Sequence, residues 1–155
     1  MALDNTPKSP CIGVCSTGIG DTVCRGCKRF THEVISWNAY SRYEKQAILN
    51  RLSSLARQVV EPVIVVEDKK LLLSALKFQH LRVDECAGEY LWLLELLKRG
   101  SSQLQSLDTF GCRIEAGFKG QNLYDLKNSI DEDFFVLSTV HYERYFLRAE
   151  PRATT

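Results

Sequence analysis

The sequence lacks every feature that would place it in or across a membrane. None of its apolar stretches approaches the roughly 18 consecutive apolar residues that a transmembrane helix needs. Its first ten residues contain two prolines and do not show the basic and then apolar pattern of a secretory signal. We therefore expect a cytoplasmic protein with no membrane partner.

The sequence also lacks the short motifs of common enzyme classes. It has no glycine-rich phosphate loop, no serine nucleophile elbow and no His-Glu-x-x-His run. The acidic run Asp131-Glu132-Asp133 does not have the alternating ligand spacing of a calcium loop, and it favours a solvated turn or helix end. No substrate is indicated, so we expect a protein that is not an enzyme.

The sequence also lacks an excess of charge of one sign, because the net charge of its 155 residues is +1. Residues 1–60 carry eight Lys/Arg and four Asp/Glu, whereas residues 61–155 carry twelve and fifteen. If four thiolates bound one divalent ion, the surplus of the first part would fall to about +2. This surplus gives only weak support for a nucleic-acid partner, which would require a clearly basic face.

What the sequence does have is a cluster of cysteines near its N-terminus. Four of the six cysteines form the pattern Cys11-x3-Cys15-x8-Cys24-x2-Cys27. In a reducing compartment such clustered thiols favour metal or redox chemistry over disulfides, and two close pairs match the needs of one tetrahedral ion. Gly26 allows the backbone to curl so that amide hydrogens face the sulfurs. The pattern predicts one metal centre held by these four cysteines.

Other interpretations of the cysteines carry less weight. A redox pair made of Cys24 and Cys27 alone would require a preceding strand and a helix starting at the motif, and it leaves the first pair without a role. Cys86 and Cys112 stand alone and are expected to be small buried hydrophobes. His32 is expected to be an exposed residue in the first turn of a helix rather than a ligand.

Two helices are predicted after the cysteines. Thr31 can cap a short helix to about residue 38, and Ser41 with Glu44 forms a capping box for a longer helix that Pro62 ends. The longer helix has an apolar stripe composed of Tyr43, Ala47, Ile48, Leu52, Leu55, Ala56 and Val59. We place a boundary at Pro62, between a metal-binding region, residues 1–61, and a second region, residues 62–155.

The second region is predicted to mix helices and strands. Its expected elements are a strand at 63–66, a helix at 68–79, a helix capped by Asp84 and stopped by Gly100, a strand at 112–116, a helix at 122–129 and an aromatic-rich strand or hairpin at 134–147. The predicted fold class is therefore α+β: a small cysteine-clamped metal loop, a helical pair and a compact α+β region.

Part of the sequence resembles a known family. The segments Ser9–Cys15 and Cys24–Cys27, then Trp37 and the helix from Ser41 to Leu52, resemble the bacterial YdhL-like family, a domain of unknown function commonly labelled a predicted iron–sulfur protein. The resemblance covers about residues 9–55 and implies that the four clustered cysteines are the ligands. It favours an iron–sulfur cluster, whereas spacing in two pairs is commoner in zinc sites. Both cofactors remain open.

Three functions are compatible with these features. The first is an accessory protein in which iron–sulfur or zinc orders the N-terminal segment and a protein partner binds. The second is an iron–sulfur protein for electron transfer or redox sensing. The third is a zinc-dependent nucleic-acid-binding module, suggested by basic residues near the cysteines: Arg25, Lys28, Arg29, Arg42, Lys45 and Arg51.

Overall fold

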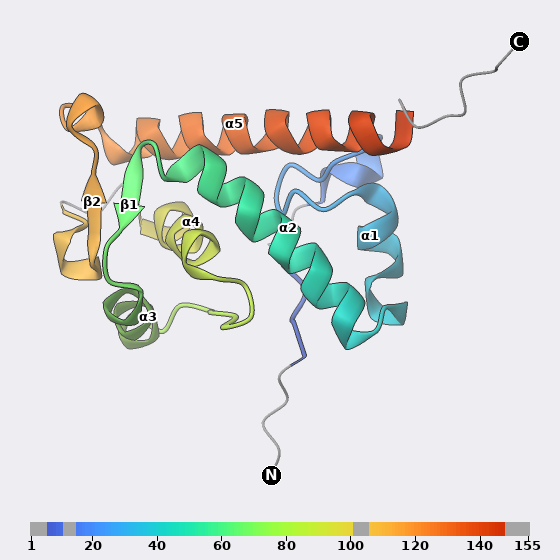
Figure 1. The fold of residues 1–155 in the computed structure, drawn as a ribbon, viewed down its shortest axis with the longest axis horizontal. Helices are drawn as coiled ribbons and strands as arrows, with labels where there is room; N and C mark the ends of the chain where they lie inside the picture. The colour runs from blue at the N-terminus through green and yellow to red at the C-terminus, as the bar shows by residue number, and fades with distance from the viewer. Residues whose placement is uncertain (1–5, 11–14, 101–105, 148–155) are drawn as a thin grey trace, which may run out of the picture.

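A computed structural model describes residues 6–10, 15–100 and 106–147. Helices dominate, and the only sheet in these residues has two strands, which agrees with the predicted α+β class (Figure 1). The main elements are α1 (Thr31–Ser36), α2 (Arg42–Val60), β1 (Ile64–Val66), α3 (Lys69–Phe78), α4 (Glu89–Gly100), β2 (Cys112–Ile114) and α5 (Leu123–Tyr142).

The short helix and the start of α2 form largely as expected. α1 begins at Thr31 and continues as a 3-10 turn, Trp37–Ala39. Thr31 does not cap it, because Phe30 occupies the N-cap position and Thr31 is already helical; the Thr31 hydroxyl donates to the carbonyl of Asp21 at 2.9 Å. The capping box of α2 is confirmed: Ser41 Oγ accepts the Glu44 amide, and the Glu44 carboxylate accepts the Ser41 amide, both at 3.2 Å.

The apolar stripe of α2 is correct in its middle and wrong at its beginning. Its buried residues are Ile48, Leu49, Leu52, Leu55, Ala56 and Val60. Tyr43 is 85% exposed and Ala47 is also exposed, because the first turn of α2 extends beyond the core. The rest of the helix packs against α4 and α5.

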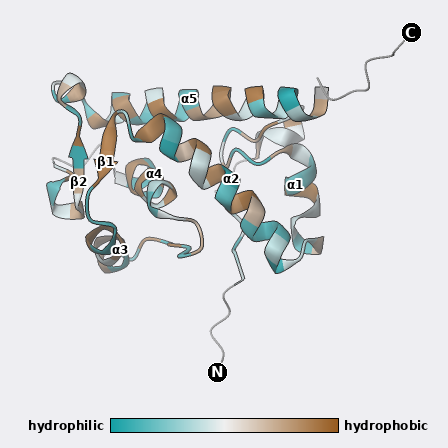
Figure 2. Ribbon diagram, in the orientation of Figure 1, coloured by the Kyte–Doolittle hydropathy of each residue, from teal (hydrophilic) through white to brown (hydrophobic). Residues whose placement is uncertain are grey.

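Both predicted strands are present, and they pair with each other. β1 and β2 are antiparallel, with Ile64 opposite Ile114 and Val66 opposite Cys112. Ile64 is fully buried, as expected for a β-branched strand on the core. In Figure 2, β1 is uniformly hydrophobic, whereas hydrophobic and hydrophilic residues alternate along α5.

Of the next two helices, α3 has an aspartate cap, whereas the aspartate cap predicted for α4 is absent. The predicted helix at 68–79 is present as α3, and Asp68 caps it, since its carboxylate accepts the Leu71 amide at 3.0 Å. Asp84 does not cap α4, which begins five residues later at Glu89. The Asp84 carboxylate accepts the Cys86 amide instead, and the Asp84 carbonyl accepts the Trp92 indole N–H at 2.8 Å.

The largest correction concerns the C-terminal part. Residues 123–142 form a single helix, α5, capped by Asn122, and not a short helix followed by a strand or hairpin. Its buried side chains, Leu126, Ile130, Phe134 and Ser138, recur every four residues. The aromatic content of this segment favours a strand locally, but packing against α2 and α4 selects the helix.

One cluster of buried side chains forms the core. It joins residues before position 61, such as Trp37 and Leu52, to residues after it, such as Leu93 and Phe134. The boundary placed at Pro62 thus runs through a shared core, and the division into residues 1–61 and 62–155 stays a prediction. No helix in the described ranges has the length and apolar character to cross a membrane.

Candidate metal centre

The second cysteine pair lies at the tip of a small hairpin. Val23 and Phe30 form an antiparallel bridge, and the Cys24 amide donates to the Arg29 carbonyl at 2.9 Å. The Lys28 amide donates back to the Cys24 carbonyl at 2.7 Å, which closes the turn. We call residues 22–31 the cysteine hairpin. Its turn brings Cys24 and Cys27 onto the same side.

The Cys24 sulfur accepts hydrogen bonds from backbone amides. Burial raises the pKa of this thiol, but the amides of Cys27, Ser16 and Gly26, together with the Cys27 side chain, outweigh that effect and lower the pKa from 9.0 to about 7. The expected curl of the backbone at Gly26 is thus present. Backbone N–H groups directed at a cysteine sulfur favour its thiolate form, which is the form that binds metal.

Cys27 lies beside Cys24 and is only 8% exposed. Burial raises the pKa of its thiol, although the Arg29 guanidinium opposes this by donating Nε–H to the sulfur at 3.2 Å. The same guanidinium lies 5.0 Å from the centre of the Trp37 ring. Arg29 therefore connects Cys27 of the second pair to the side chain of Trp37.

The first pair is described in part. Cys11 lies outside the described residues. Cys15 is exposed, and its sulfur is 2.8 Å from the Thr17 hydroxyl. Its neighbour Ser16 touches the hairpin twice, because its amide faces the Cys24 sulfur and its hydroxyl accepts the Arg25 amide at 2.8 Å. The Cys15–Ser16 segment therefore lies against the second pair.

Three of the four predicted ligands, Cys15, Cys24 and Cys27, lie in the described residues. Within residues 6–10, 15–100 and 106–147, no three His, Cys, Asp or Glu side chains are grouped closely enough to hold a metal ion. Cys24 and Cys27 are brought together, and Ser16, the neighbour of Cys15, contacts the hairpin, but Cys15 does not complete such a group. Two adjacent thiols, one of them already facing backbone N–H groups, fit a thiophilic ion such as zinc or iron.

Polar contacts attach the hairpin to α5. Lys28 is 1% exposed; its ammonium lies 2.6 Å from the Asp131 carboxylate and also donates to the Arg25 carbonyl. The Arg25 guanidinium stacks 4.1 Å above the Phe135 ring and approaches Glu132 at 3.9 Å. These contacts could not be predicted from the sequence, because the partners are about a hundred positions apart.

A second set of contacts holds the base of the hairpin. Phe30 is 3% exposed and lies edge-on to Tyr142 at 5.3 Å, with the Arg51 guanidinium 3.9 Å from its ring centre. Arg51 makes two hydrogen bonds of 2.6 Å to the buried Glu33 carboxylate. Glu33 also accepts the Phe30 amide at 2.9 Å. This buried ion pair carries no sequence motif.

Residues outside the cluster largely behave as expected. His32 is exposed and contacts the Phe146 ring rather than a cysteine. Cys112 is 3% exposed, and burial raises the pKa of its thiol to about 12. Cys86 is half-buried, so it is less enclosed than expected.

Comparison with known proteins gives one match. Residues 9–56 match the model of a family described as "Protein of unknown function (DUF1289)". The match includes all four clustered cysteines, α1 and most of α2, and it ends before β1. The match supports a domain of unknown function in this part of the chain, whereas the YdhL-like label and its iron–sulfur cluster stay predictions. No curated protein and no solved structure matches.

Proposed function

We propose that Cys11, Cys15, Cys24 and Cys27 hold one metal centre that orders the N-terminal segment of a non-enzymatic accessory protein. The observation that carries this proposal is the Cys24 sulfur, which accepts amides from Gly26 and Cys27 within the turn of the hairpin. A turn of this kind presents two thiolates to one ion.

The composition of the hairpin supports a role for the metal in folding. Among its buried residues, Lys28 and Arg29 are cationic, and only Val23 and Phe30 are large and apolar. Two such side chains bury too little apolar surface to order ten residues, so a coordinate clamp is needed. The thiolates would also provide negative charge next to the two buried cations.

The donor set suits either zinc or an iron–sulfur cluster. A closed four-thiolate zinc site has a structural role, whereas a cluster can also transfer electrons. Purification without air, followed by analysis of zinc, iron and sulfide and by a visible spectrum, separates the two. Iron with sulfide and a band that bleaches with dithionite would support the electron-transfer alternative, and colourless zinc would remove it.

Exposed apolar side chains near the hairpin support a protein partner. Ile19 is 86% exposed, Ile35 is 77% exposed and Phe146, which packs against Phe30, is 44% exposed. Ile19 precedes and Ile35 follows the hairpin in the sequence, and exposed apolar side chains that gather on one part of a surface are typical of interaction sites. Of the basic residues that suggested nucleic acid, Lys28 and Arg29 are buried, so they do not contribute to a basic face.

The partner proposal is testable with matched variants. We expect Ile35→Glu to abolish association with a specific partner identified by co-purification, while thermal stability stays unchanged. Phe78→Glu is the control, because Phe78 is 80% exposed on α3, away from the hairpin. A partner that binds both variants equally would contradict a site next to the metal centre.

A further inference from the structure

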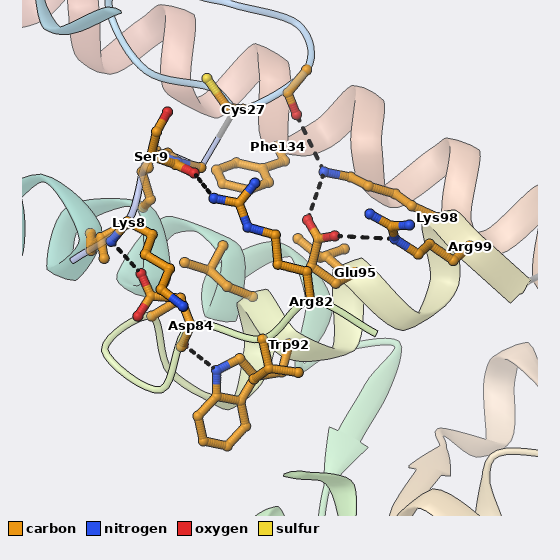
Figure 3. A pocket seen from close by; sticks show the side chains of 18 residues that line it. Lys8, Ser9, Cys27, Arg82, Asp84, Trp92, Glu95, Lys98, Arg99 and Phe134 are labelled. Carbon is orange, nitrogen blue, oxygen red and sulfur yellow. Dashed lines mark hydrogen bonds and ion pairs between the residues drawn. The ribbon is translucent and has the colours of Figure 1, made fainter. Parts of the chain in front are cut away.

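A cavity of about 110 Å³ opens between the N-terminal residues, the cysteine hairpin and α4 (Figure 3). Ser9 and Pro10 line one side, Gly26 and Cys27 line another, and α4 provides most of the remaining wall. The cavity lies beside the cysteines, yet its chemistry comes mainly from other parts of the chain.

The inner wall of the cavity is apolar. It is formed by Leu49 and Leu52 of α2, Leu91 and Leu94 of α4 and Phe134 of α5. Three helices that meet in the core thus leave a small hydrophobic recess near the surface. An engineered cavity of roughly 150 Å³ binds benzene. The cavity in this protein is smaller, so it accepts an apolar group no larger than one ring or a short chain.

The rim of the cavity carries an excess of positive charge. Its four cations are Lys8, Arg82, Lys98 and Arg99, and its two carboxylates are Asp84 and Glu95. Glu95 lies 3.9 Å from the Lys98 ammonium and 4.0 Å from the Arg99 guanidinium, whereas Asp84 accepts backbone amides. Both acids are therefore already engaged.

Arg82 is the cation best placed to meet a ligand. Its side chain reaches toward the backbone of Ser9, whose carbonyl accepts one N–H at 3.3 Å (Figure 3). Within the described part of the chain, Arg82 has no carboxylate partner. A guanidinium that is bound only to a carbonyl can still receive a carboxylate through two parallel hydrogen bonds.

We propose that this cavity binds a small organic carboxylate with an apolar body. The ligand carboxylate binds Arg82, with Lys98 nearby, and the apolar group of the ligand packs against Leu91 and Phe134. Nucleotides are excluded, since ligands of that size occupy pockets of about 300 Å³ or more. The proposal does not depend on a metal at the cysteines.

Titration calorimetry with benzoate and hexanoate tests this site, and Trp92 fluorescence provides a second signal because its indole lines the cavity. We expect saturable binding of at least one acid, with the neutral analogues benzamide and hexanol about tenfold weaker. No saturable binding of either acid, or equal binding of the neutral analogues, would overturn the proposal.

Variants locate the binding. Arg82→Gln should weaken the acid about tenfold and Arg82→Lys less, because lysine keeps the charge but not the paired donors. Lys119→Gln, which removes an exposed charge away from the cavity, should leave binding unchanged. Ala87→Leu, which fills the cavity, should abolish binding while circular dichroism stays that of the folded protein. Undiminished binding to the folded Ala87→Leu protein would place the ligand elsewhere and overturn the proposal.

Discussion

The helical core and the cysteine hairpin are held together by different forces. In the core, side chains such as Leu72, Leu76, Leu93 and Leu97 are completely buried, and stabilisation comes from apolar surface removed from water. In the hairpin, the contacts to the rest of the chain include ion pairs, cation–π contacts and ring contacts, such as Lys28 with Asp131, Arg25 with Phe135 and Phe30 with Tyr142.

The core and the hairpin therefore lose stability in different ways when side chains are replaced. Apolar packing is spread over many contacts, so the core loses stability gradually as single side chains are shortened. A buried charge such as Lys28 depends on one partner, and loss of that partner leaves the charge desolvated and unpaired. The hairpin therefore needs both its ionic contacts and its proposed metal, whereas the core needs neither.

The largest expected effect is that of metal removal. A structural zinc ion contributes on the order of 10 kcal/mol to the folding of a small module, so a chelator should remove hydrogen-exchange protection from the amides of the cysteine hairpin. Amides of α4, Glu89–Gly100, should keep their protection because they lie in the apolar core. Loss of nearly all helical circular dichroism would show that the two regions fold as one.

The next effect in size concerns Trp37, which belongs to the core cluster and also contacts Arg29 of the hairpin. Its side chain is 5% exposed. Trp37→Ala should therefore lower the free energy of unfolding by about 3–5 kcal/mol. Denaturant melts measure this. A change below about 0.5 kcal/mol, the range of surface substitutions, would contradict a packing role.

A smaller effect is expected at the ion pair between hairpin and α5. Asp131→Asn should cost about 2 kcal/mol, below the value for fully buried pairs, because the Asp131 side chain is 43% exposed. The double variant Lys28→Met with Asp131→Asn should recover most of this loss, since it removes the buried charge as well. A double variant less stable than Asp131→Asn would show that Lys28 stabilises the hairpin by other contacts.

The smallest effect is chemical and concerns Cys112 on β2. Because burial raises the pKa of this thiol to about 12, it should resist iodoacetamide in the native protein at pH 8, whereas exposed Cys15 should react readily once metal is removed. Mass spectrometry after timed labelling measures both rates. Equal labelling of the two thiols would contradict the enclosure of Cys112 in the core.

Local signals in the sequence were sufficient for the fold where they were specific. The capping box at Ser41 and the stop at Pro62 are both confirmed, because they depend on neighbouring residues. α5 was missed because its aromatic residues favour a strand locally, and only packing against α2 and α4 selects the helix.

The candidate site also combines a local feature, which follows from neighbouring residues, with contacts between residues that are distant in the sequence. The turn between Cys24 and Cys27 follows from spacing and from Gly26, and the structure contains it. The Lys28 contact with Asp131 and the Arg51 contact with Glu33 could not be predicted, because nothing in a single sequence indicates which distant charges meet. Cys11 lies outside the described residues, so its role as a ligand stays a prediction.

Metal content in single cysteine variants tests the central claim most directly. Protein purified without air should contain one metal centre per chain, and Cys11→Ser or Cys15→Ser should each lower that content sharply. Cys86→Ser is the matched control and should keep full content, because Cys86 lies outside the cluster. Full occupancy in the Cys15→Ser protein would contradict the four-cysteine centre.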